Sequence, residues 1–190
     1  MVKKPITWHV NEEGLSNEVI SDFMSLIMSK GLYLGVFPWY KLNKKEILRR
    51  DQTMHYPFGF IVNTGGHFVS VVVRDKDILY TDSFAAPIPD PLRAFFLNMN
   101  SARDKKKKKK KKNKRKNVRR AVLRNNRQIQ SFSSTHCGLY AALFTIWNVV
   151  PKEALQHINE QGLTFSRTNL EENDALCVRY LKNCIRSIVI

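Results

Sequence analysis

The chain has 190 residues, a length that suits one domain with a full hydrophobic core, and we expect a single domain over residues 1–190. Its formal net charge is +16, but 14 of its 32 Lys and Arg residues lie in residues 103–120, so the remainder is close to neutral. No segment reaches the roughly 18 apolar residues of a membrane span, and no apolar stretch follows the N-terminal residues, so neither a membrane span nor a secretory signal is predicted.

Cysteine usage indicates the redox environment. The three cysteines, Cys137, Cys177 and Cys184, are few and odd in number. In a helix, Cys177 and Cys184 would lie on one face but roughly 10 Å apart, which is too far for a disulfide. The sequence therefore favours a reducing, intracellular setting.

The first predicted elements are a helix over residues 16–30 and a partly extended segment over residues 33–40. Ser16 can cap the helix and Gly31 can stop it. The residues expected on its apolar face are Ile20, Phe23, Met24 and Ile27. This spacing predicts a helix that packs on the core with one face.

Three predicted strands follow, over residues 58–63, 67–73 and 78–84. A Thr-Gly-Gly turn signal separates the first two, and residues 75–77 turn the chain again. Because both connections are short, the three strands are predicted to form an antiparallel meander. We therefore expect an α+β fold with a central, mostly antiparallel sheet and flanking helices.

Helices, a basic loop and a further strand are predicted after the meander. Asp90 begins a helix, residues 103–117 form a solvated, low-complexity loop, and residues 118–130 include a basic strand. A short helix is expected over residues 152–161, and Asn169 is expected to cap the last helix. The residues that this last helix should turn inward are Leu176, Cys177, Tyr180, Leu181 and Cys184.

The stretch from Cys137 to Trp147 contains no charged residue and is typical of a buried helix. It places Cys137 at the helix N-terminus, where backbone N–H groups and the helix dipole stabilise a thiolate. Cys137 is therefore a candidate nucleophile if a base lies nearby. The alternative is a free cysteine that serves as a small buried hydrophobic residue.

Two residues of the predicted sheet can complete a nucleophilic site. His67 opens one strand and Asp82 lies near the end of the next, and these positions are neighbours in a tight antiparallel pair. An imidazole base, an orienting carboxylate and the Cys137 thiol would form a triad. Gln130 could donate to a developing oxyanion together with the Cys137 N–H, and Gly138 is expected to let a substrate backbone approach. Taken singly, His67 could be a turn residue, Asp82 a strand cap and Gln130 a surface amide.

Three segments carry a resemblance to a known family. They are Ile-Val-Asn-Thr-Gly-Gly-His at residues 61–67, Leu-Tyr-Thr-Asp-Ser-Phe at residues 79–84, and Gln-x6-Cys-Gly-Leu at residues 130–139. In order and spacing they resemble the adenovirus endopeptidase (adenain) family and its wider clan, which includes the SUMO-deconjugating proteases. The resemblance covers roughly residues 30–148 and implies an adenain-like cysteine protease fold from a virus or virus-like mobile element.

The resemblance also implies roles for individual residues. Cys137 would be the nucleophile, His67 the base, Asp82 the residue that orients it, and Gln130 the oxyanion donor. No cofactor or metal would be needed for the chemistry, but DNA, with or without a viral peptide, would act as an activator. The chain departs from the family at Phe68, where a Trp is common, and it has no cysteine before Cys137 for a disulfide-linked activating peptide.

The basic segment, residues 103–117, is a candidate nucleic-acid-binding site because Lys and Arg neutralise phosphates and release counterions. The candidate residues are Lys105, Lys106, Lys107, Lys108, Lys109, Lys110, Lys111, Lys112, Lys114, Arg115 and Lys116. No aromatic residue interleaves with them, so any binding is predicted to be independent of nucleotide sequence. The alternatives are a nuclear-localisation signal and a solvated segment without a partner.

These observations predict a monomeric cysteine endopeptidase without a membrane partner. The resemblance implies protein substrates such as capsid or core precursors, cut during virion maturation in the host nucleus or the virion, with stimulation by DNA. Two alternatives remain. One is a deconjugase for ubiquitin- or SUMO-like proteins, and the other is a non-enzymatic, basic DNA-binding protein whose cysteine is structural.

Overall fold

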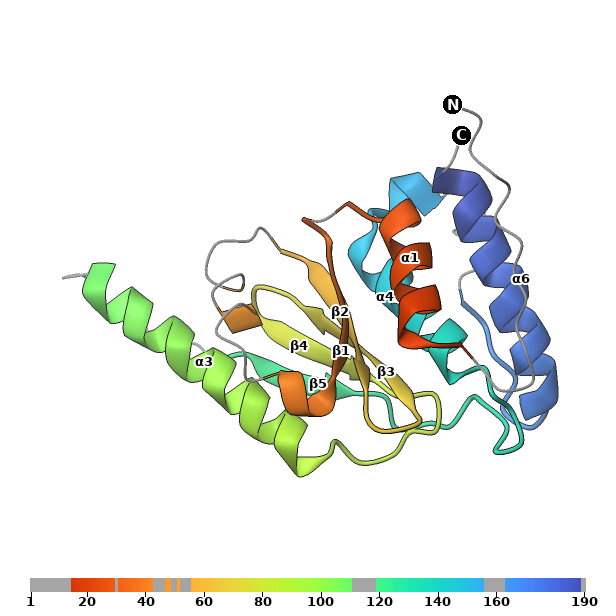
Figure 1. Ribbon diagram of the computed structural model, residues 1–190, viewed down its shortest axis with the longest axis horizontal. Helices are drawn as coiled ribbons and strands as arrows, with labels where there is room; N and C mark the ends of the chain where they lie inside the picture. The colour runs from red at the N-terminus through yellow and green to blue at the C-terminus, as the bar shows by residue number, and fades with distance from the viewer. Residues whose placement is uncertain are drawn as a thin grey trace.

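A five-stranded sheet with helices on both faces forms the body of the protein (Figure 1). The computed structural model describes residues 15–29, 31–42, 47–48, 51, 56–110, 119–155 and 163–188. The strands are β1 (Tyr33–Pro38), β2 (Phe58–Asn63), β3 (Phe68–Val73), β4 (Asp77–Thr81) and β5 (Ala121–Arg124). They lie in the sheet in the same order as in the chain.

The pairing of the strands makes the sheet mixed. β2 pairs with β3 and β3 with β4 in antiparallel fashion, which confirms the predicted meander. β1 pairs with β2, and β4 with β5, in parallel fashion. The antiparallel character is therefore confined to the centre, because the edge strands join it through longer connections that allow the chain to cross over.

Helices form one layer on each face of the sheet. α1 (Asn17–Ile27), α4 (Cys137–Val149) and α6 (Leu170–Ile188) cover one face, and α3 (Asp90–Lys110) covers the other (Figure 1). Short 3-10 turns occur at Trp39–Lys41 and Lys152–Leu155. β3 is buried along its whole length because both of its faces meet a helical layer. None of the helices in the described ranges is long and apolar enough to cross a membrane.

The predicted caps begin two of these helices. Ser16 Oγ accepts a hydrogen bond from Val19 N at 3.3 Å, and Asn169 Oδ1 accepts one from Glu172 N at 3.1 Å. The four residues predicted for the apolar face of α1 are its buried residues. Of the helix predicted over residues 152–161, the turn at its start is present, and residues 156–162 lie outside the described part of the chain.

The prediction of a loop over residues 103–117 is wrong in its first part. α3 continues through Lys110, and residues 111–118 lie outside the described part of the chain. Once packing of the first turns has nucleated a helix, each further residue adds one hydrogen bond, and Lys is a good helix former. In Figure 1 the C-terminal end of α3 projects away from the sheet.

The chain returns to the core at Arg120. Arg120 N donates to Asn100 Oδ1 at 3.2 Å, and Asn100 Nδ2 donates to Arg120 O at 3.2 Å. The Arg120 guanidinium is buried, donates to Asp51 Oδ1 at 2.8 Å and lies over the Tyr56 ring. The two residues that bracket the basic segment are therefore hydrogen-bonded to each other, and one is anchored by a buried ion pair.

Candidate active site

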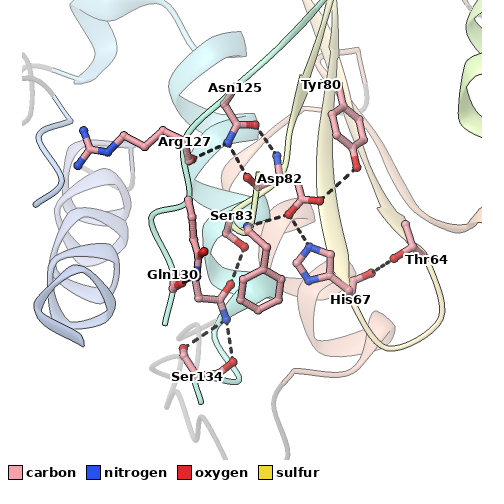
Figure 2. A network of polar contacts seen from close by, with 11 residues as sticks. Thr64, His67, Tyr80, Asp82, Ser83, Asn125, Arg127, Gln130 and Ser134 are labelled. Carbon is pink, nitrogen blue, oxygen red and sulfur yellow. Dashed lines mark hydrogen bonds and ion pairs between the residues drawn. The ribbon is translucent and has the colours of Figure 1, made fainter. Parts of the chain in front are cut away.

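His67 and Asp82 meet at one end of the central strands (Figure 2). His67 directly precedes β3, Asp82 directly follows β4, and the register that pairs Ser70 with Thr81 brings both to the same end of the sheet. His67 Nε2 lies 2.8 Å from Asp82 Oδ1. The structure thus brings together the imidazole and the carboxylate that strand order predicted to be neighbours.

The turn before β3 fixes the position of His67. Asn63 Oδ1 accepts hydrogen bonds from the backbone N–H groups of Gly65 and Gly66 at 2.9 and 3.2 Å. Both glycines have positive φ, +96° and +102°, which a residue with a side chain rarely adopts. Thr64 closes the turn by donating through N and Oγ1 to His67 O. The imidazole therefore projects from a tight, hydrogen-bonded turn.

Asp82 is buried, and both of its carboxylate oxygens accept hydrogen bonds. Its Oδ1 also accepts from Phe84 N at 2.8 Å, and its Oδ2 accepts from Tyr80 OH at 3.3 Å. Asn125 holds the backbone of Asp82 from both sides, since Asn125 Oδ1 accepts from Asp82 N at 2.9 Å and Asn125 Nδ2 donates to Asp82 O at 2.6 Å. Such contacts keep the carboxylate aimed at the imidazole.

The surroundings of His67 decide its charge. Burial by itself lowers the pKa of His67, but the hydrogen-bonded Asp82 carboxylate and the nearby Cys137 side chain raise it to about 9. The other ring nitrogen, Nδ1, is buried and has no hydrogen-bond partner among the described residues. The raised pKa favours the imidazolium form of the ring, which the Asp82 carboxylate holds and which Cys137 also stabilises.

Cys137 is the first residue of α4, and its side chain is half-buried. The rest of the helix is packed into the core, as its apolar sequence predicted. Gly138 was predicted to let a substrate approach, and the structure gives it a packing role as well. A Cβ at residue 138 would lie 2.7 Å from Ile20 Cδ1, so this glycine allows α1 and α4 to pack closely.

Gln130 is fully buried, which excludes the alternative of a surface amide. Its Oε1 accepts from Ser83 Oγ at 2.5 Å, and its Nε2 donates to Ser134 O at 2.8 Å, with Ser134 Oγ at 3.3 Å (Figure 2). The amide nitrogen therefore faces the loop of residues 131–136 that leads directly to Cys137.

Two aromatic residues that sequence reasoning missed form a stack with His67, in which Phe84 lies on the imidazole and Phe132 lies on Phe84. The rings of His67 and Phe84 are 4.8 Å apart and inclined at 23°, and those of Phe84 and Phe132 are 5.6 Å apart and inclined at 21°. Phe132, in the loop before Cys137, is 80% exposed. The stack shields one face of the imidazolium from water and favours its charge through the π-face of Phe84.

The predicted nucleic-acid-binding residues lie elsewhere. Residues 105–110 form the last turns of α3, whereas the other candidates, Lys111, Lys112, Lys114, Arg115 and Lys116, lie outside the described part of the chain. Within the described residues, no group of three or more His, Cys, Asp or Glu side chains is placed to hold a metal ion.

Together these contacts assemble the parts that nucleophilic chemistry requires. An acidic side chain orients an imidazolium, the imidazolium interacts with a thiol at a helix N-terminus, and a buried amide faces the loop beside the thiol. An imidazolium beside a sulfur stabilises the thiolate form, and the same ring can later give its proton to a leaving group.

The chain resembles known proteins in its fold but not detectably in its sequence as a whole. No family model and no curated protein matches the sequence. The ASFV pS273R protease matches with a TM-score of 0.58 and 15% identity over 95% of this chain and 68% of that chain. The SUMO protease Ulp1 matches with a TM-score of 0.56 and 14% identity over 97% of this chain and 85% of that chain. The Ulp1 protease domain bound to Smt3, the yeast ortholog of SUMO, matches with a TM-score of 0.53 and 14% identity over 90% of this chain and 76% of that chain.

These neighbours are proteases, and Ulp1 has a catalytic cysteine. The chain therefore has the α+β fold of the Ulp1-like proteases, as the sequence predicted.

Proposed function

We propose that this protein is a cysteine protease that hydrolyses peptide or isopeptide bonds by acyl transfer through Cys137. The observation that carries the proposal is the His67 imidazole, whose Nε2 lies 2.8 Å from the Asp82 carboxylate and whose pKa is raised by Asp82 and by Cys137 at the start of α4. A structural cysteine would require neither partner.

In the proposed reaction, the Cys137 thiolate attacks the carbonyl carbon of the scissile bond, and the carbonyl oxygen becomes an oxyanion. The Gln130 amide and the Cys137 backbone N–H stabilise this charge. The oxyanion collapses to a thioester, the C–N bond breaks, and the His67 imidazolium gives its proton to the leaving amine. Water, deprotonated by His67, then attacks the thioester, releases the acid product and restores the thiolate–imidazolium pair.

For the substrate class, we propose endoproteolysis of protein precursors, with viral capsid or core precursors as the first candidates. Two observations support this choice: the fold is shared with a protease of ASFV, and the chain carries a basic segment suited to DNA. DNA would then act as a sequence-independent activator that concentrates enzyme and substrate on one polyanion, in the host nucleus or the virion.

The second candidate is removal of a ubiquitin- or SUMO-like protein from its conjugates. The observation that favours it is the similarity of the fold to the Ulp1 protease domain, which was solved in complex with Smt3, the yeast ortholog of SUMO. The same acyl transfer would serve both functions, so the substrate and not the chemistry separates them.

Incubation with defined substrates tests these proposals. Wild type and Cys137→Ala are each incubated with a capsid-type precursor and with a SUMO conjugate, with and without duplex DNA, and products are identified by mass spectrometry. Precursor cleavage that is stimulated by DNA and lost in Cys137→Ala is expected. Cleavage of the conjugate alone would reverse the order of the two candidates, and equal cleavage by Cys137→Ala would overturn the mechanism.

A further inference from the structure

We propose that Ser83 is a positioning residue of the active site, which fixes the orientation of the Gln130 amide and links it to Asp82. The inference rests on the proposed function for its catalytic consequence, and on the hydrogen bonds around Gln130 for its geometry. Ser83 follows Asp82 directly, and its side chain is buried.

The contacts of Gln130 leave one orientation for its amide. Ser134 O can only accept a hydrogen bond, so the group that faces it at 2.8 Å must be the Nε2 amino group. Oε1 then faces Ser83 Oγ at 2.5 Å, and Ser83 must be the donor of this bond. If the amide rotated by half a turn, Oε1 would face the Ser134 carbonyl and two acceptors would meet. Ser83 and Ser134 thus specify the same orientation from opposite ends.

This orientation is the one that the proposed reaction needs. Nε2 carries two N–H groups, and Ser134 O occupies one of them. The second makes the longer contact, 3.3 Å to Ser134 Oγ, and is the group available to an oxyanion beside Cys137. Without the Ser83 hydroxyl, the buried Oε1 of Gln130 would lose its hydrogen-bond donor. The amide would then be held only by Ser134, at Nε2.

The backbone adds a second link between Ser83 and Gln130. Ser83 O accepts hydrogen bonds from Ile129 N at 2.9 Å and from Gln130 N at 3.2 Å. One residue therefore holds both the main chain and the side chain of Gln130, while its neighbour Asp82 holds His67. Asp82, which orients the imidazolium, and Ser83, which orients the proposed oxyanion donor Gln130, are therefore adjacent residues.

Kinetics of matched variants test the catalytic role. Loss of an oxyanion donor lowers kcat about 10²- to 10³-fold, so Gln130→Ala sets the scale. We expect Ser83→Ala to lower kcat about 10²-fold with little change in KM, since a misplaced group costs about this much. The Ser83→Ala/Gln130→Ala double variant should be no slower than Gln130→Ala alone. Ser83→Thr, which keeps the hydroxyl, should recover activity, and the exposed Ser133→Ala serves as the control.

Two further measurements keep this inference separate from the proposed function. Alkylation of Cys137 by iodoacetamide forms no oxyanion, so its rate should be the same in Ser83→Ala as in the wild type. A much lower alkylation rate would indicate a general structural defect. The side-chain amide resonances of Gln130 should shift and exchange faster with solvent in Ser83→Ala. An unchanged kcat in Ser83→Ala would overturn the proposal. So would unchanged Gln130 resonances in Ser83→Ala, and this second test applies even if the protein turns over no substrate. A wild type that turns over no substrate while the resonances shift would overturn only the proposed function.

Discussion

The hydrogen-bonded end of the sheet and the basic segment are organised in opposite ways. Around His67, single residues from separate parts of the chain meet through short hydrogen bonds, and Asp82 and Gln130 are buried there. The basic segment repeats one residue type along a continuous stretch. The first region depends on the identity and position of each side chain, whereas the second depends on the sum of its charges. Single substitutions should therefore have large effects in the first region and graded effects in the second.

The largest effect is expected from Asp82→Asn. The uncharged amide can no longer hold the imidazolium, and loss of such an orienting carboxylate lowers kcat by about 10⁴-fold in a comparable triad. With Asp82 removed, burial should bring the pKa of His67 down from about 9, so the alkaline limb of the kcat/KM profile should move to lower pH. Asp77→Asn, at the opposite end of β4, is the control, and equal losses in both variants would contradict the assignment.

The same pair predicts how stability depends on pH. His67 has a raised pKa in the folded protein, so its contribution to the free energy of unfolding is complete below about pH 6.5, its ordinary value, and is lost as pH rises through about 9. Urea unfolding of wild type and Asp82→Asn at intervals of pH should show their difference shrinking over this window. A difference that grows over the same window would show that His67 is not charged in the fold.

Alkylation distinguishes the reactive thiol from the packed ones. Burial raises the pKa of Cys184 to about 12 and also raises that of Cys177, whereas Cys137 is half-buried beside the His67 imidazolium. We expect iodoacetamide at neutral pH to label Cys137 at least about tenfold faster than either of the others, as peptide mapping by mass spectrometry can show. Equally slow labelling of all three would favour the structural cysteine.

A smaller effect, on stability only, is expected from Gly138→Ala. The added methyl group would meet Ile20 between α1 and α4, and overpacking of this kind costs about 1–3 kcal/mol in the free energy of unfolding. Thermal denaturation should show a lower Tm, and Ile20→Val in the same chain should restore part of it. An unchanged Tm with a raised KM would instead return Gly138 to its predicted role beside the substrate.

The smallest single-residue effects are expected in the basic segment. Each Lys→Gln change among residues 105–112 should weaken DNA binding slightly and reduce the slope of log affinity against log salt by about one. Turnover in the absence of DNA should stay at the wild-type value, because the site is formed by other elements. If one of these changes abolished DNA binding while its neighbours had no effect, the segment would contain a specific site, and the contrast between the two regions would fail.

The sequence was informative where the relevant contacts are local. The glycine turn before His67 and the short return to Asp82 predict an antiparallel pair, and that pair brings imidazole and carboxylate together. The partners of β1 and β5 could not be predicted, since distant parts of the chain decide parallel pairing. Ser83 and Asn125 gave no signal because a small polar residue in a turn usually has only a local role. Their function depends on hydrogen bonds between residues more than 40 positions apart: Ser83 donates to Gln130, and Asn125 accepts from Asp82.

The hydrogen bonds between Asn100 and Arg120 have an evolutionary consequence. The chain leaves the core and re-enters it at a single point, so the core places little constraint on the length of what lies between. Insertions, deletions or a wholly different excursion could be exchanged there without rethreading the strands that carry the catalytic groups. A lineage could thus acquire, lose or replace its basic segment while the proposed catalytic site stays the same, and a protein engineer could use the same junction to graft a reporter.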